Sequence, residues 1–217
     1  MNDQLIKSDF DFGYKKWELD PIYAKLTLKY QKGDILDIGC ATCQMYEFLK
    51  RNNWKNQYYG IDIQKYEGYN YPDNVNLIIG DATSLEFPKA DTILLYSILE
   101  HVNDPISLLK KSLDSCRKNV LVHVPQRNED MWKNGLVECH QLDKTHMHCG
   151  FSKAEIHSIV DISGGSIKKY METDAKNAIM GVNLWNNIIP KLTFILLNKM
   201  FSSKTFYENI WLEVVKK

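Results

Sequence analysis

Hydrophobic residues are concentrated in five short runs that are rich in β-branched and aromatic side chains and end at Gly, Asp or Pro. Runs of this length and composition predict β-strands. Near-continuous apolar runs, such as residues 92–96, are typical of central strands buried on both faces of a sheet. The predicted strands cover residues 35–38, 58–63, 75–79, 92–96 and 120–124.

Helical patterns lie between most of these runs. Asp20 precedes a helix that starts at Pro21, and Ser152 with Glu155 predicts a capping box. Residues 64–74 lack a helical pattern, so the second crossover is predicted as a loop or one short turn. Strands alternating with helices predict an α/β fold with a parallel sheet covered on both faces. The predicted helices cover residues 21–30, 44–52, 104–116 and a segment from 152 to about 163.

Composition narrows the functional classes. With 217 residues and a formal net charge of zero, the chain fits one domain and lacks the basic excess of most nucleic-acid-binding enzymes. The longest apolar stretch, residues 192–201, is interrupted by Asn198 and Lys199 and is too short to span a bilayer. Five cysteines is an odd number, and reduced thiols are the simplest interpretation. We therefore expect a cytoplasmic protein with no nucleic-acid partner and no stable membrane insertion.

Acidic residues follow successive predicted strands. Asp37 precedes a turn of small residues, Gly39 to Thr42, whose N–H groups and following helix end suit an anion. Asp62 ends the next strand, where a carboxylate binds a ribose diol, and Asp81 ends the third, where it could accept a hydrogen bond from an adenine amine. A single Asp at a strand end is often only a turn former. Several in succession predict a nucleoside-cofactor site at the carboxyl edge of the sheet.

A nicotinamide-binding fingerprint is the main competing interpretation. It requires the pattern G-x-G-x-x-G, but Ala41 and Gln44 occupy the second and third glycine positions here. That interpretation also leaves Asp37 and Asp81 unexplained.

The same residues resemble the motifs of class I S-adenosylmethionine-dependent methyltransferases of the small-molecule type, including the ubiquinone-pathway group. The resemblance covers about residues 33–165. It rests on residues 35–42, on the ribose-type acid in 60–62, on the adenine-type acid in 80–82, and on residues 90–105 with their E-H-V-x-D-P ending.

The resemblance implies a Rossmann-like three-layer sandwich with a seven-stranded, mostly parallel sheet and an antiparallel last strand. Residues 167–173 and 207–215 suit its end. S-adenosyl-L-methionine is the implied cofactor. Its expected binding residues are Asp37, Gly39, Cys40, Ala41, Asp62, Ile63, Asp81, Ala82 and Ser97.

One departure from the family pattern concerns the first turn. The family usually has glycine at the position of Cys43 and often at that of Ala41. We favour a tolerated small-residue replacement. The alternative is a reactive thiol at a helix N-terminus.

The catalytic candidates are histidines. His101 follows the fourth strand, where the resemblance places cofactor and acceptor. The Asp143-x-x-His146 spacing matches a family pattern that lines the acceptor pocket. Histidine suits proton transfer near neutral pH, so His146 is the first choice as base or acceptor-orienting residue, with Asp143 holding its ring. His101 could instead only hold its loop.

The surrounding run also contains metal-competent residues, but its spacing is not that of a standard zinc module, so we expect no metal site. The candidates considered were Cys139, His140, His146, His148 and Cys149.

We expect a single domain over residues 1–217. The cofactor-binding core covers about 33–125, with acceptor-site insertions at about 126–150 and 183–202. Trp132, Trp185 and the second insertion either cap the acceptor or form a dimer surface, so a homodimer remains open. The expected reaction is methyl transfer to a small-molecule or glycan-type acceptor, most simply on oxygen. The alternatives are a binding protein without catalysis and a metal-assisted enzyme.

Overall fold

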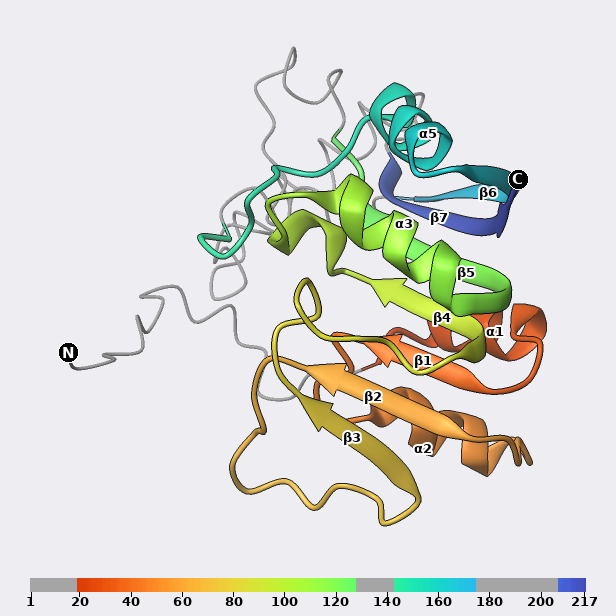
Figure 1. Ribbon diagram of the computed structural model, residues 1–217, viewed down its shortest axis with the longest axis vertical. Helices are drawn as coiled ribbons and strands as arrows, with labels where there is room; N and C mark the ends of the chain where they lie inside the picture. The colour runs from red at the N-terminus through yellow and green to blue at the C-terminus, as the bar shows by residue number, and fades with distance from the viewer. Residues whose placement is uncertain (1–18, 128–142, 175–206) are drawn as a thin grey trace, which may run out of the picture.

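The computed structural model describes residues 19–127, 143–174 and 207–217. The strands of these segments form a seven-stranded sheet in the order β3-β2-β1-β4-β5-β7-β6 (Figure 1). Strands β1 to β5 are mutually parallel, and β7 runs antiparallel to both of its neighbours. The strands are β1 (Ile35–Ile38), β2 (Tyr58–Asp62), β3 (Val75–Ile79), β4 (Ala90–Tyr96), β5 (Cys116–Pro125), β6 (Gly165–Asp174) and β7 (Tyr207–Lys216).

Helices cover both faces of the sheet, which confirms the predicted three-layer architecture. In Figure 1, α3 and α5 lie on the face toward the viewer, and α1 and α2 lie behind the sheet. Turns connect β2 to β3 without a helix, as the sequence pattern predicts. The helices are α1 (Pro21–Tyr30), α2 (Gln44–Arg51), α3 (Pro105–Ser115) and α5 (Lys153–Ile162), with a 3₁₀ turn η1 (Leu99–His101) directly after β4.

Alternate residues of each central strand enter different hydrophobic cores. Leu36 and Ile38 of β1 pack in the core beneath α3 and α5, whereas Ile35 packs in the core beneath α1 and α2. All three side chains are fully buried. Each contributes about 1.5–3 kcal/mol relative to exposure. Central strands therefore need apolar residues on both faces, which is why their hydrophobic residues form continuous runs in the sequence.

Three helices begin at side-chain caps, and the sequence analysis predicts those at Asp20 and Ser152. Asp20 accepts a hydrogen bond from the Ile22 N–H at 2.7 Å, and Asp104 accepts one from the Ser107 N–H at 2.9 Å. Ser152 and Glu155 form a reciprocal capping box. Helix α2 differs, because it begins at Cys43 without a side-chain cap and with Cys43 in the left-handed conformation.

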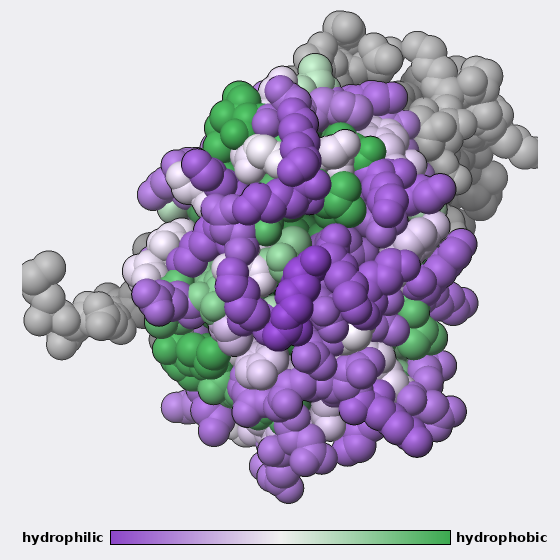
Figure 2. All heavy atoms as spheres, turned by 45° about the vertical axis from the view of Figure 1, so that its right-hand side comes forward, coloured by the Kyte–Doolittle hydropathy of each residue, from purple (hydrophilic) through white to green (hydrophobic). Residues whose placement is uncertain are grey.

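The topology positions the site. The chain order reverses on either side of β1, which is flanked by β2 and β4. Ligands of open parallel sheets bind at such a switch point, beyond the carboxyl ends of the strands. The opposite edge, on the side turned forward in Figure 2, has a mostly hydrophilic surface with separate hydrophobic patches.

Within the described segments, no helix has the length and apolarity needed to cross a membrane. The predictions about Trp132, Trp185 and residues 183–202 lie outside the described residues.

Candidate functional site

The turn between β1 and α2 has a glycine-like backbone but is mostly built from other residues. Gly39, Ala41 and Cys43 have φ values of 78°, 46° and 59°. The N–H groups of Gly39 and Cys40 donate to the Ile61 carbonyl at 2.8 and 3.1 Å, which ties the turn to β2. A left-handed conformation costs a residue with a Cβ about 1–2 kcal/mol. The turn thus retains its shape at an energetic cost.

The two cysteines of the turn lie against the glycine of the neighbouring strand. A Cβ added to Gly60 would lie 2.7 Å from Cys40 Sγ and 3.4 Å from Cys43 Sγ. Cys43 is fully buried and does not line the adjacent cavity. It therefore fits beneath the turn. This position favours a tolerated replacement over a reactive thiol, because reactivity requires access.

Cys40 and Cys43 also have C-x-x-C spacing, which the sequence analysis did not use. Both thiols are free in the structure and buried. A hydrogen bond with Cys43 and burial raise the pKa of the Cys40 thiol far above its usual range, so Cys40 is a neutral packing residue.

A cavity of about 240 Å³ lies over this turn at the carboxyl edge. It brings together five of the predicted cofactor residues, which are Asp37, Gly39, Cys40, Ala41 and Ser97. The rest of the lining comes from the same turn, from the start of α1, the start of α2 and the ends of β4 and β5, and of these residues sequence reasoning had named only Thr42 as part of the cofactor site. These residues are Leu19, Asp20, Tyr23, Thr42, Gln44, Met45, Tyr96 and His123.

Asp37 places a buried carboxyl group on the wall of this cavity. The Tyr58 hydroxyl donates a hydrogen bond to Asp37 Oδ2. Burial raises the pKa of Asp37 to about 6, against the opposing effect of the Tyr58 hydrogen bond and with a further increase from the Asp62 charge. Among the described residues, no Lys or Arg forms an ion pair with Asp37. A cationic ligand group would complete this environment.

His123 was not predicted as a site residue. It lies on β5, and its Nδ1 is 2.9 Å from Ser97 Oγ. The Tyr23 ring packs on it with centroids 3.9 Å apart, and Ser97 itself has a positive φ of 50°. The available signal was a polar residue inside the apolar run 120–124, a position that is usually either hydrogen-bonded or functional.

Asp62 lies at the end of β2, beside the same turn. Its Oδ2 accepts a hydrogen bond from the Ala41 N–H at 2.8 Å, and its Oδ1 accepts a longer one from the Gln64 N–H at 3.3 Å. The next side chain, Ile63, is 71% exposed. A carboxylate followed by an uncovered apolar side chain suits a ribose joined to a flat base.

Asp81 and Ala82 lie further along the edge, after β3, and do not line the cavity. Asp81 Oδ1 accepts hydrogen bonds from the N–H and the hydroxyl of Thr83, each at 2.8 Å. These bonds lower the pKa of Asp81. The Ala82 carbonyl accepts a hydrogen bond from Lys111 Nζ at 2.8 Å.

The predicted catalytic residues form a second cluster, outside the cavity lining. His101 in η1 and His146 come together from distant parts of the chain, with ring centroids 4.5 Å apart at an edge-on angle. Asp143 Oδ2 lies 3.7 Å from His146 Nε2. The fold therefore assembles all three residues at the end of β4.

The residues at the carboxyl edge fit S-adenosylmethionine on three observations. The cavity has a buried carboxyl group for an ammonium, its wall includes the small residues Gly39 and Ala41, and Asp62 with Ile63 provides a polar and an apolar surface side by side. No Cβ blocks this approach at Gly39.

The fold and the site define the class of Rossmann-like α/β proteins that bind a nucleoside cofactor at the carboxyl edge. A family model described as "Methyltransferase domain" matches residues 17–164, more than half of the chain. The chain belongs to this family, and it is an S-adenosylmethionine-dependent methyltransferase. The ubiquinone-pathway subgroup is not specifically supported. No match was found among curated proteins.

Solved structures share the fold at low sequence identity. Magnesium protoporphyrin IX methyltransferase from Synechocystis PCC 6803, with bound S-adenosylhomocysteine, has a TM-score of 0.56 and 14% identity over 94% of this chain and 91% of that chain. The plantazolicin methyltransferase BpumL, in complex with a pentazolic desmethyl analogue and S-adenosylhomocysteine, has a TM-score of 0.54 and 19% identity over 90% and 82%. The [4+2]-cyclase SpnF has a TM-score of 0.59 and 14% identity over 90% and 80%. At these identities the similarity shows the fold alone.

Proposed function

We propose that this methyltransferase methylates a hydroxyl group of a small-molecule or glycan-type acceptor. The observation that carries the proposal is the His101–His146 pair, which lies directly after β4 with ring centroids 4.5 Å apart. Ser97, four residues before His101, lines the cavity next to Asp37. The cluster is therefore adjacent along the chain to the cofactor cavity, where an acceptor would meet the methyl group.

The cofactor residues have separate roles in this proposal. Asp37 binds the α-ammonium of the methionine part, and the turn of residues 39–41, which lines the cavity beside Asp37, packs against that part. Asp62 binds the ribose diol. Ile63, Asp81 and Ala82 contact the adenine, and Ser97 lies toward the sulfonium end.

The chemistry requires little from the protein beyond alignment and proton removal. The cofactor supplies a methyl group that is already activated on a sulfonium. The acceptor O–H loses its proton, the oxygen forms a bond to the methyl carbon as the carbon–sulfur bond breaks, and the sulfonium becomes a neutral thioether. His101, His146 and Asp143 hold the acceptor hydroxyl and promote the loss of its proton. Burial opposes the charged form of Asp143. Hydrogen bonds from Thr145 and the electrostatic effect of His146 and His101 lower its pKa, so Asp143 is an anionic partner for His146.

A methyl-transfer assay tests the proposal. Labelled S-adenosylmethionine would be incubated with the full chain and a panel of phenols, sugars and hydroxy acids, with amines and thiols as contrasts. We expect transfer to a hydroxyl acceptor. His146→Ala should lower kcat by about 100-fold or more, the size of effect expected when the group that promotes loss of the acceptor proton is removed, with little change in cofactor affinity. His157→Ala, a histidine on α5 that packs against Tyr170, is the matched control and should retain activity.

Two results would overturn the proposal. Transfer to amines or thiols alone would change the acceptor class. An equal loss of cofactor affinity in His146→Ala would assign His146 to the cofactor site.

A binding protein without catalysis is the second candidate. It is favoured by the non-glycine residues Ala41 and Cys43 in left-handed conformations, which raise the cost of forming the turn. Binding of S-adenosylhomocysteine in calorimetry, with no transfer to any acceptor of a broad panel, would favour it.

The proposal keeps the expectation of a cytoplasmic location, which free thiols at Cys40 and Cys43 support. The proposal includes a homodimer. The mass of the purified protein in solution tests whether it is one.

A further inference from the structure

Three potential metal-binding side chains converge at the end of β4. Glu100 and His101 belong to η1, and His146 belongs to the turn after Asp143. One donor atom of each lies within 4.8 Å of the other two. The two segments are joined by backbone hydrogen bonds, because the Glu100 carbonyl accepts the N–H groups of Met147 at 2.8 Å and His148 at 3.0 Å.

Glu100 is an uncompensated buried carboxyl group. The residue is 1% exposed, and within the described part of the chain its Oε2 has no hydrogen-bond partner. No Lys or Arg of the described residues forms an ion pair with it. A buried carboxylate without a partner is costly, and a cation would remove that cost.

One of the two imidazoles is oriented by a hydrogen bond, and the other lies near a carboxylate. His101 Nδ1 lies 3.2 Å from the Thr145 carbonyl oxygen, so Nδ1 donates and the other ring nitrogen is left as an acceptor. Asp143 lies beside His146 and is itself fixed by the N–H and hydroxyl of Thr145, at 2.8 and 2.6 Å. Histidine ligands of metals are usually oriented in this way by a carbonyl or a carboxylate.

We propose that Glu100, His101 and His146 bind one divalent transition-metal ion of the zinc class, with an open position toward the acceptor. Two imidazoles and one carboxylate form a donor set that zinc and its first-row neighbours bind in catalytic sites, and they suit magnesium less well. A tetrahedral ion with bonds of about 2.0–2.2 Å brings its ligand atoms to roughly 3–4 Å from one another. Small side-chain rotations therefore close the site.

This site differs from the set considered from the sequence. His148 Nε2 lies 3.1 Å from the Val102 carbonyl oxygen, to which it donates, and Cys149 is exposed away from the group. Cys139 and His140 lie outside the described residues. The sequence analysis did not consider Glu100 as a metal ligand, because its burial is visible only in the fold.

The role of the ion rests on the proposed function, although its binding does not. Coordination of an acceptor hydroxyl lowers the pKa of that hydroxyl, so its proton leaves to solvent before oxygen attacks the methyl carbon. This is how the histidine pair would promote proton loss without accepting the proton itself.

Direct metal binding tests the inference without cofactor or acceptor. The full chain would be freed of metal with a chelator and titrated with Zn²⁺ by calorimetry and with Co²⁺ by absorption. We expect one ion per chain and visible Co²⁺ bands typical of nitrogen and oxygen ligands. Glu100→Gln, His101→Ala and His146→Ala should each lower the affinity by about 10-fold or more. His148→Ala and His157→Ala should leave it within about 2-fold, and thermal melting checks that each variant is folded.

Unchanged affinity in the three ligand variants would overturn the site, as would a Co²⁺–thiolate charge-transfer band, which would place the ion on cysteine. Preference for Mg²⁺ over Zn²⁺ would overturn its chemical class. The two proposals can fail separately. If the chain binds the metal ion but methylates no hydroxyl group, the metal site stands and the proposed function fails. If it methylates a hydroxyl group but binds no ion, the proposed function stands and the metal site fails.

Discussion

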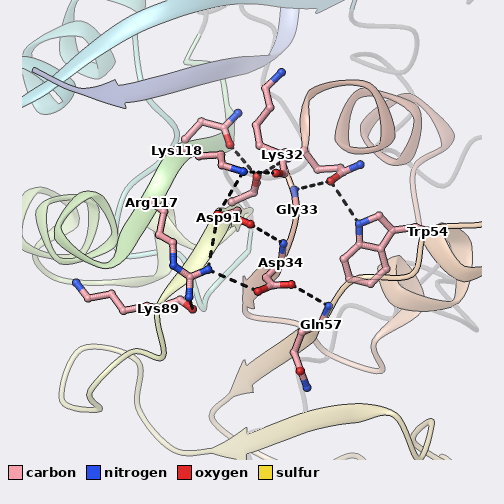
Figure 3. Close-up of polar contacts among 12 residues, drawn as sticks. Lys32, Gly33, Asp34, Trp54, Gln57, Lys89, Asp91, Arg117 and Lys118 are labelled. Atoms are coloured by element: carbon pink, nitrogen blue, oxygen red, sulfur yellow. Dashed lines mark hydrogen bonds and ion pairs between the residues drawn. The ribbon is translucent and has the colours of Figure 1, made fainter.

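The two edges of the parallel sheet treat their acidic residues in opposite ways. At the amino edge, Asp34 and Asp91 lie among basic side chains: Arg117 is 3.5 and 3.6 Å from the two carboxylates, and Lys118 is 3.5 Å from Asp91 (Figure 3). At the carboxyl edge, Asp37 and Glu100 are buried without such partners among the described residues. The carboxylates of the first edge are neutralised within the protein, whereas the second edge has buried carboxyl groups whose charged form a cationic ligand would stabilise.

The backbone of the two edges differs as well, because it is hydrogen-bonded to side chains at the amino edge and strained at the carboxyl edge. At the amino edge, the Asp34 N–H donates to Asp91 Oδ2 at 3.2 Å and the Gln57 N–H donates to Asp34 Oδ1 at 3.1 Å (Figure 3). At the carboxyl edge, Ala41, Cys43 and Ser97 occupy left-handed conformations. The comparison separates residues that stabilise the fold from residues that prepare a site at a cost to stability.

The largest expected effect concerns Asp62. Asp62→Ala removes a carboxylate that would bind two ribose hydroxyls. Charge-assisted hydrogen bonds contribute about 1.5–3 kcal/mol each, so the Kd for S-adenosylhomocysteine should rise by about 100-fold or more. Calorimetry measures the change. The free energy of unfolding should also fall, by about 1–3 kcal/mol, because the Ala41 N–H loses its acceptor, so affinity is measured on folded protein. Retained affinity would show that the ribose lies elsewhere.

Asp37 should make stability depend on pH. Its folded-state pKa of about 6 lies above the unfolded value of 3.8. The folded chain therefore holds a proton that the unfolded chain loses between about pH 4 and 6, and stability falls over that window. Asp37→Asn lacks this loss, so by pH 8 it should be more stable than the parent by about 2–3 kcal/mol, and equal to it near pH 3.5. Denaturant unfolding at both pH values measures the difference, and a constant difference would contradict the assignment.

The pKa of Asp91 is shifted in the opposite direction from that of Asp37. Burial opposes its charged form, but the Asp34 N–H, Lys118 and Arg117 lower its pKa. Asp91→Ala should lower the free energy of unfolding by about 1–3 kcal/mol, because it leaves the Asp34 N–H without its acceptor. Cofactor affinity in folded protein should be unchanged, and a loss of affinity would mean that the two edges are coupled.

The smallest effect concerns strain in the turn. Ala41→Gly should raise the free energy of unfolding by up to about 1 kcal/mol, because glycine adopts φ of 46° at little cost. Ala24→Gly in helix α1 is the matched control and should lower stability by about 1 kcal/mol. If both substitutions destabilise the chain equally, Ala41 is not strained.

The sequence predicts the strands and helix starts well because local chemistry specifies them. Asp20, Asp104 and Ser152 cap the helices that their positions predict. The continuous apolar runs are central strands buried on both faces. Strand ends differ by a few residues, as at β5, which starts at Cys116 rather than 120.

The site is predicted less completely because its residues meet only in three dimensions. The acids at strand ends could be found because parallel strands bring their carboxyl ends to one edge. His123 reaches the cavity from β5 beside Tyr23 of α1, and no spacing in the sequence links these two elements. Glu100 was grouped with a motif, but its burial without a partner follows from the turn at His146 closing over η1.

The contact between Gly60 and the two cysteines has a consequence for how the chain can change by mutation. A Cβ at position 60 would lie 2.7 Å from Cys40 Sγ, so Gly60→Ala forces the Cys40 side chain to shift, whereas it is easier once Cys40 has been replaced by a smaller residue. Once alanine occupies position 60, the return of cysteine at position 40 meets the same close contact. The order of substitutions, and not only their identity, therefore decides which versions of this turn remain reachable.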